Sequence, residues 1–250
     1  RIAMDGDQKA AIVEVNSETD FVAKNEVFQA YVEAVAAQVL GSEAADVEAL
    51  SSEAWIEDPS KSVKDALTEK IATIGENLSI RRFQRVNSEG CIVPYIHGGG
   101  RIGVLVEAET DVINDEIKEC LKNIAMQVAA LNPKYVARAD VSAEFLAHER
   151  EIILAQIMND PKESQKPEKV IAGMIEGRIS KEMKEICLND QVYVKAEDGK
   201  QSVSNYVKSV AQANGAALSI KSFIRFETGE GLEKKQENFA EEVAAQMAGR

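Results

Sequence analysis

Histidine and cysteine are scarce in this 250-residue chain, and each scarcity excludes a class of site. The two histidines, His97 and His148, are far apart, and no His-Glu-x-x-His or Cys-x-x-Cys spacing supplies zinc ligands. The three cysteines are odd in number and widely separated, which favours a reducing, cytoplasmic setting over a disulfide framework. No Gly-x-Ser-x-Gly elbow marks a nucleophile. We therefore expect no metal site, no cofactor and no enzymatic reaction.

Long apolar runs and an excess of basic charge are absent as well. No apolar stretch approaches the roughly 18 to 20 residues that span a bilayer. The formal net charge is -13 and the sequence pI is about 4.8, so nucleic acid and anionic membranes should repel the chain. We therefore expect neither nucleic acid nor a membrane as a direct partner.

One pattern occurs twice in the chain. An apolar, strand-like run leads into Glu-Thr-Asp and a further apolar residue at 12–21 and again at 103–112. Helical periodicity follows each copy, and similar closing strands lie at 78–83 and 218–223. Three strands with helices on one face can bury a core. The sequence therefore predicts an α+β fold with two related three-stranded sheet/helix subdomains.

A longer connection and a tail complete the predicted organisation. Apolar residues recur at helical spacing in 145–157 and in 171–186, on either side of a proline-framed turn at 160–167, which predicts an inserted antiparallel helical hairpin. A stripe in 238–247 predicts a C-terminal helix. The expected domains are a first core subdomain (1–88), a second (89–140 and 198–230), the hairpin (141–197) and the C-terminal module (231–250).

The segment Ser17–Asn25 admits two interpretations. Ser17 or Thr19 could cap a helix, with Asp20 favoured by the helix dipole, Phe21 serving as a core or staple residue and Asn25 capping a second helix. Alternatively, the acid and the aromatic are presented to a partner. The second copy of the repeat has valine in place of the aromatic, so the shared fold does not require Phe21.

Five segments resemble the bacterial elongation factor Ts family. The signature-like stretch Thr19-Asp20-Phe21-Val22-Ala23-Lys24-Asn25 is the first, and the others follow in the family's order over nearly the whole chain: 74–82, 97–106, 223–234 and 238–244. The resemblance implies a core of two related subdomains, an inserted helical hairpin and a terminal helix. It also implies a small helical domain that would precede Arg1.

The resemblance further implies release of GDP from elongation factor Tu, the expected partner in its GDP-bound and then nucleotide-free states. Asp20 and Phe21 would enter the partner near its magnesium and phosphate site, supported by Thr19, Val22, Lys24 and Asn25. Further expected partner contacts are His97, Gly98, Arg101, Phe239 and Val243. The factor would act in the cytoplasm by protein contact, without a cofactor of its own.

Two other classes of function remain open at this stage. A non-catalytic scaffold could assemble, or self-associate, through the hairpin at 141–197, because two apolar stripes without a third helix can leave a face that needs a partner. A hydrolase built on paired carboxylates would need a divalent ion, and no pair of acids stands out in the sequence. The glycine run at 98–100 is interpreted as a plain hairpin turn.

Overall fold

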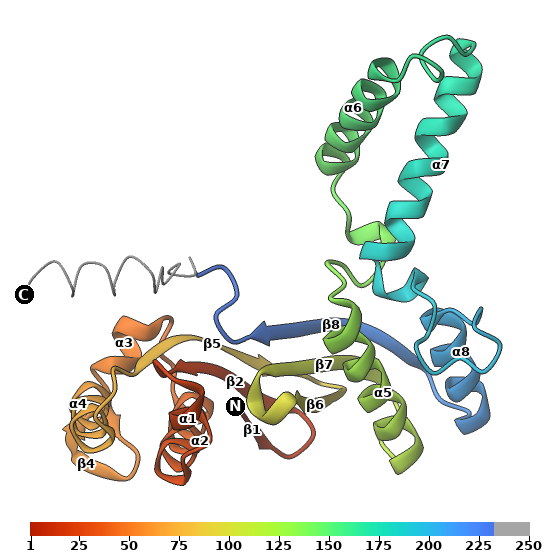
Figure 1. The fold of residues 1–250 in the computed structure, drawn as a ribbon. Coiled ribbons are helices and arrows are strands. Elements are labelled where there is room, and N and C mark those ends of the chain that lie inside the picture. The colour runs from red at the N-terminus through yellow and green to blue at the C-terminus, as the bar shows by residue number, and fades with distance from the viewer. Residues whose placement is uncertain (233–250) are drawn as a thin grey trace, which may run out of the picture.

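The computed structural model describes residues 1–232, whose elements form two sheet-and-helix layers and a projecting pair of helices (Figure 1). The first sheet has the strand order β1-β2-β5 and the second β6-β7-β8, with every neighbouring pair antiparallel. These strands are β1 (Ile2–Asp5), β2 (Lys9–Asn16), β5 (Ser79–Asn87), β6 (Cys91–His97), β7 (Ile102–Thr110) and β8 (Leu218–Glu227). Together with the helices they confirm the predicted α+β class.

The first sheet packs its alternate residues against helices. Ala11, Val13 and Val15 of β2 face α2 (Glu26–Gly41), and α4 (Val63–Ile74) joins the same core. Two short elements of this half were not predicted: α3 (Val47–Ser51) and a two-stranded sheet of β3 (Ala54–Trp55) and β4 (Asp58–Ser62). Trp55 is buried there, with its ring centroid 5.8 Å from that of Tyr31.

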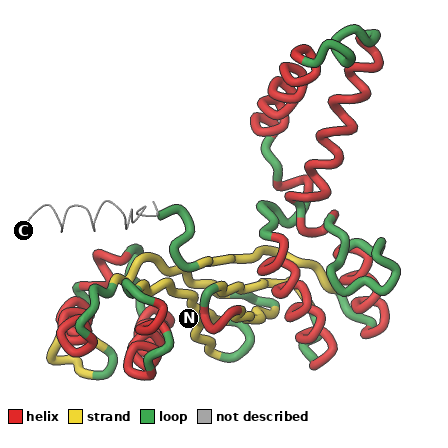
Figure 2. Tube along the Cα trace, viewed as in Figure 1, coloured by secondary structure: helices red, strands yellow, loops and turns green. Residues whose placement is uncertain are grey.

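The second sheet repeats this arrangement. Val104, Val106 and Ala108 of β7 face α5 (Asp115–Leu131), and α8 (Val203–Asn214) completes the core before the chain enters β8. The opposite faces of the two sheets share a smaller apolar cluster of Ala10, Ile12, Ile92, Leu105 and Phe226. Each half therefore has its own core. The strands of the two sheets lie next to each other (Figure 2), and a third apolar core joins them.

The two halves have a β-bulge at the same place. The register shifts between Glu14 and Val15 in β2 and between Glu107 and Ala108 in β7, and the extra residues on the partner strands are Arg81 and Lys221 respectively. This equivalence changes the alignment suggested by the Glu-Thr-Asp motifs. Thr19 is five residues beyond Glu14, whereas Thr110 is three residues beyond Glu107, so the first copy has two extra residues before its Thr-Asp pair. They carry Asp20 and Phe21 past the end of the sheet.

The connection between α5 and α8 forms the projecting pair, α6 (Ala143–Asn159) and α7 (Glu168–Ile186) (Figure 1). Ile153, Ile157, Ile179 and Met183 form a core between the two helices. Backbone hydrogen bonds from Lys134 and Tyr135 to the carbonyl of Ile186 close its base. The short 3-10 helices η2 (Arg138–Asp140) and η3 (Leu188–Asp190) flank it.

The predicted C-terminal helix, with Phe239 and Val243, lies outside the described residues. Among helices of residues 1–232, none combines the length and apolar character that crossing a bilayer requires.

Candidate functional site

The segment after β2 forms a short helix held by two caps. Thr19 has an extended backbone and its hydroxyl accepts a hydrogen bond from the Val22 amide at 3.4 Å, which begins α1 (Asp20–Ala23). Asn25 caps the next helix, α2, by accepting from the amides of Val27 (2.8 Å) and Phe28 (3.3 Å). The predicted capping roles of Thr19 and Asn25 are thus confirmed.

Glu76 ties this turn to the other end of the first half. Its carboxylate accepts the Thr19 backbone N–H at 3.0 Å and the Thr19 hydroxyl at 2.6 Å. Glu76 directly follows Gly75, which ends α4 in the left-handed conformation (φ 81°). Sequence analysis gave Glu76 no role, although its position after the helix-ending glycine of the 74–82 segment was the available signal.

Phe21 does not belong to the core. Its residue surface is 81% exposed, and α1 has no buried residue. Val22 supplies the anchor, since it is half-buried and packs against the first core. The interpretation of Phe21 as a core or staple residue is therefore wrong, and the chain holds a large aromatic ring in solvent on a tethered turn.

Asp20 is exposed as well, as is Asp111 of the second copy, but the two carboxylates have different partners. Its carboxylate lies 4.0 Å from the Lys24 ammonium, a surface pair that contributes little to stability. Asp111 instead accepts the Ala217 amide at 2.8 Å and so joins the start of β8 to its own half. The Thr110 hydroxyl likewise hydrogen-bonds within its own turn, accepting the Val112 amide and donating to the Val112 carbonyl. The second copy closes on itself, whereas the first presents its acid and its ring outward.

The other predicted contact residues lie in the β6–β7 turn. Gly98, Gly99 and Gly100 have φ angles of 61°, 67° and 103°, which favour glycine, and they form η1 (Gly98–Gly100) between two strands as a hairpin turn requires. His97 is exposed, and its Nδ1 lies 3.1 Å from the Tyr95 hydroxyl. The carbonyl of Arg101 accepts the Thr228 amide at 2.9 Å, which links this turn to the end of β8.

Those predicted contact residues that the structure describes thus occupy two surfaces. Residues 19–25 follow β2 of the first sheet, and residues 97–101 run from the end of β6 to the start of β7 in the second. Within residues 1–232 no group of three or more His, Cys, Asp or Glu side chains is arranged to hold a metal ion. The three cysteines are buried, and burial raises the pKa of Cys120 to about 11.

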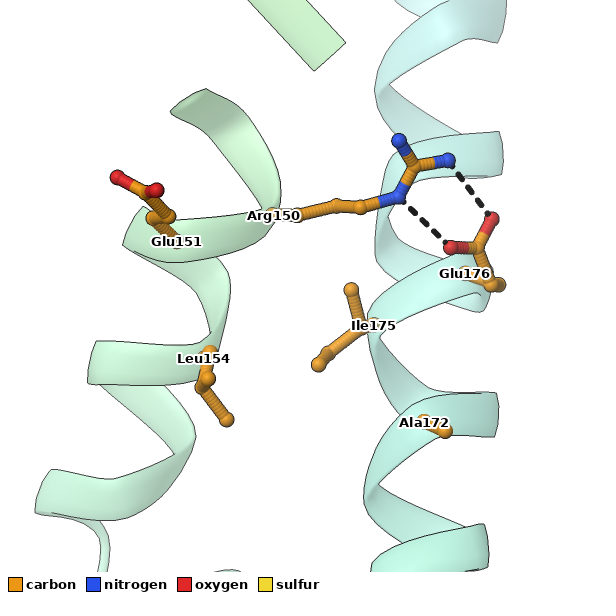
Figure 3. Close-up of a pocket in the computed structure, with 6 residues that line it drawn as sticks. All are labelled: Arg150, Glu151, Leu154, Ala172, Ile175 and Glu176. Atoms are coloured by element: carbon orange, nitrogen blue, oxygen red, sulfur yellow. Dashed lines mark hydrogen bonds and ion pairs between the residues drawn. The ribbon is translucent and has the colours of Figure 1, made fainter. Parts of the chain in front are cut away.

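A concavity lies elsewhere, between α6 and α7 (Figure 3). It has a volume of about 250 Å³ and is open to solvent, with Leu154 and Ile175 at its centre. The Arg150 guanidinium crosses from α6 to the Glu176 carboxylate on α7 at 2.9 Å. Its six lining residues include no nucleophile beside a base and none of the predicted contact residues.

Comparison with known proteins supports the sequence resemblance. The family model described as elongation factor TS matches residues 18–230. Elongation factor Ts of Clostridioides difficile (strain 630) is 45% identical over 243 residues, which cover 97% of this chain and 78% of that protein. The Clostridium kluyveri (strain NBRC 12016) protein of the same name is 46% identical over 250 residues, covering 100% of this chain and 79% of the relative. Elongation factor Ts of Clostridium perfringens (strain SM101 / Type A) is 47% identical over 238 residues, which cover 95% of this chain and 76% of that protein.

Proposed function

Because the chain belongs to the elongation factor Ts family, we propose that it is a guanine nucleotide exchange factor that promotes GDP release from elongation factor Tu. Family membership makes it a translation elongation factor. The exchange step, its partner and a cytoplasmic site of action are the proposal. No chemical bond is made or broken, so the protein is not an enzyme in the usual sense.

The exposure of Phe21 carries this proposal. An 81% exposed phenylalanine has no stabilising role in the isolated chain that would explain its position, and large aromatic side chains are typical energetic centres of protein interfaces. The turn that holds it is fixed by the Thr19 cap, the Asn25 cap and the Glu76 tether. Such preorganisation lowers the ordering cost of binding.

The proposed mechanism is a wedge. Phe21 would enter between side chains of the partner, and Asp20 would contact the surface beside it, near the magnesium ion that neutralises the GDP phosphates. Displacing the supports of that ion weakens GDP binding. The coupling is reciprocal, so GDP weakens binding of the factor by the same ratio. Thr19, Val22, Lys24 and Asn25 hold the wedge in place.

Two further contact surfaces belong to the proposal. His97, Gly98 and Arg101 form an exposed turn on the second sheet that would touch a different domain of the partner. Phe239 and Val243, in the C-terminal segment, would contact its nucleotide-binding domain. Contacts at separate places would make the wedge part of a broad interface, in which few residues provide most of the binding energy.

A second candidate function, a scaffold that assembles through 141–197, is supported by apolar side chains on the projecting helices. Ile152, Leu154, Met158 and Val170 are exposed there. Such a scaffold would bind a partner or a second copy through this face and would not require Phe21. Deleting the hairpin distinguishes the two functions.

The decisive experiment is release of a fluorescent GDP analogue from elongation factor Tu, with and without substoichiometric amounts of this chain. Faster release with repeated turnover is the expected result. Unchanged release, both with this chain and with a longer one that carries the family's N-terminal helical domain, would contradict the proposal and favour the scaffold.

A further inference from the structure

The chain leaving the last strand is attached to the first sheet through a buried carboxylate. Glu14 of β2 is 3% exposed and accepts hydrogen bonds from Arg81 Nη1 at 2.9 and 3.1 Å and from Arg82 Nε at 2.5 Å. It also accepts the backbone N–H of Gly229 at 2.9 Å, from a residue 215 positions later in the chain. This contact therefore fixes the segment that follows β8 to the first sheet.

The two arginines extend this attachment. Arg81 Nη2 donates to the carbonyl of Glu230, and Arg82 Nη2 donates to the carbonyl of Glu227 at 3.2 Å. The Arg82 guanidinium also lies 4.2 Å from the ring centroid of Phe226, at the end of β8. Each arginine therefore contacts both Glu14 and the segment that leaves β8. We call Glu14, Arg81 and Arg82, with residues 227–230, the exit clamp.

The clamped segment is a defined turn. Gly229 and Gly231 have φ angles of 76° and 75°, which favour glycine. The amides of Glu230 and Leu232 donate to the carbonyls of Glu227 (3.2 Å) and Gly229 (3.1 Å). The turn sets the direction in which the chain continues, and the clamp fixes the turn to β2.

The second sheet provides an internal comparison. Glu107 lies at the equivalent bulge of β7, is 6% exposed, and accepts from Lys221 Nζ at 2.9 Å and Ser222 Oγ at 2.8 Å. Both donors come from the neighbouring strand, β8. The Ser88 side chain, which precedes β6, is a further hydrogen-bonding partner of the Glu107 carboxylate. A buried glutamate is therefore common to both sheets, but of the two it is Glu14 that holds the segment leaving β8.

We propose that Glu14 is a positioning residue, which orients residues 227–232, where the chain leaves β8, relative to the Phe21 turn. The same strand, β2, carries Glu14 in its interior and leads directly into α1 with Phe21. One strand therefore holds both the Phe21 turn and the clamped residues 227–230. The effect on nucleotide exchange rests on the proposed function, while the attachment itself does not.

The first test is hydrogen exchange of the Gly229 amide in Glu14→Gln, with Glu107→Gln as the matched control. Glu14→Gln should lower protection of that amide by roughly tenfold or more, because its acceptor loses the negative charge, and hydrogen bonds to charged groups are stronger than those to neutral ones. Glu107→Gln should change it by less than about twofold, since none of the Glu107 partners Lys221, Ser222 and Ser88 belongs to the turn around Gly229. Equal loss in both variants, or no loss in either, would overturn the proposal. If Glu14→Gln does not fold, Arg81→Met, which leaves Glu14 paired with Arg82, takes its place with the same expectation.

The second test is GDP release at varied factor concentration, using the full chain and a chain ending at residue 232, which retains all four apolar cores. In the full chain Glu14→Gln should raise the half-saturating concentration by roughly tenfold with little change in maximal rate. In the shorter chain it should have no further effect, because the residues that follow the clamped turn are absent. An undiminished effect in the shorter chain would refute the positioning role. If the unaltered chain does not accelerate release, the proposed function fails, and hydrogen exchange alone decides the clamp.

Discussion

Phe21→Ala should slow GDP release from elongation factor Tu while leaving the fold intact. Truncating a buried phenylalanine typically costs about 3 to 5 kcal/mol of stability. Phe21 is 81% exposed, so truncating it removes only about a fifth of the buried surface that a core phenylalanine would lose. The expected loss of stability is therefore about 1 kcal/mol or less. Loss of an aromatic interface centre typically costs about 2 kcal/mol or more, which corresponds to roughly thirtyfold slower catalysed release.

Phe28→Ala is the matched control for this change. Phe28 lies in the first turn of α2 and is 6% exposed within the first core, so its truncation should cost about 3 kcal/mol or more. Stability would be measured by urea denaturation and exchange by stopped-flow fluorescence of labelled GDP. A core-sized stability loss in Phe21→Ala, or unchanged GDP release, would refute the reasoning.

Three further changes test other parts of the structure. Glu76→Ala removes the carboxylate that accepts the Thr19 amide and hydroxyl, so the free energy of unfolding should fall by about 1 kcal/mol. GDP release should also slow although Phe21 is still present, and normal exchange kinetics would contradict a role for this tether. Replacing 141–197 with a short linker should leave GDP exchange largely unchanged, because the projecting helices have their own core. Loss of exchange activity in this variant would instead favour the scaffold. Acid should destabilise the fold, which urea midpoints between about pH 7 and about pH 3 would measure. Burial raises the pKa of Glu14 and of Glu107, but hydrogen bonds outweigh burial and hold each pKa below the ordinary 4.5. The two ionised carboxylates therefore stabilise the fold above about pH 4.5, and this stabilisation is lost as the pH falls through their lowered pKa values. A variant with both glutamates changed to glutamine should lose less stability over the same range, and an identical loss would show that other groups are responsible.

The repeat made much of the fold predictable. Strand alternation and helical periodicity predicted the two sheets and their main helices, because each half buries one face of each element. The β3–β4 hairpin was missed because a two-residue strand and a strand containing Pro59 carry little periodic signal. The motif alignment of the two copies was off by two residues, since the shared bulge is visible only in the strand register.

The candidate site was only partly predictable. The caps at Thr19 and Asn25 follow local rules, and both formed as expected. Whether Phe21 or Val22 enters the core depends on the angle at which a one-turn helix meets α2, and sequence pattern does not determine that angle. The Glu76 tether and the Glu14 attachment to Gly229 join segments far apart in sequence, so no local pattern reveals them.

The position of Trp55 makes one half of the molecule optically distinct. It is the one tryptophan of the chain and lies buried in the first core, against Tyr31. Its emission therefore follows the unfolding of the half that presents Phe21, whereas far-UV circular dichroism follows the helices of both halves. Comparing the two signals during one denaturant titration would measure how strongly the second half is coupled to the first.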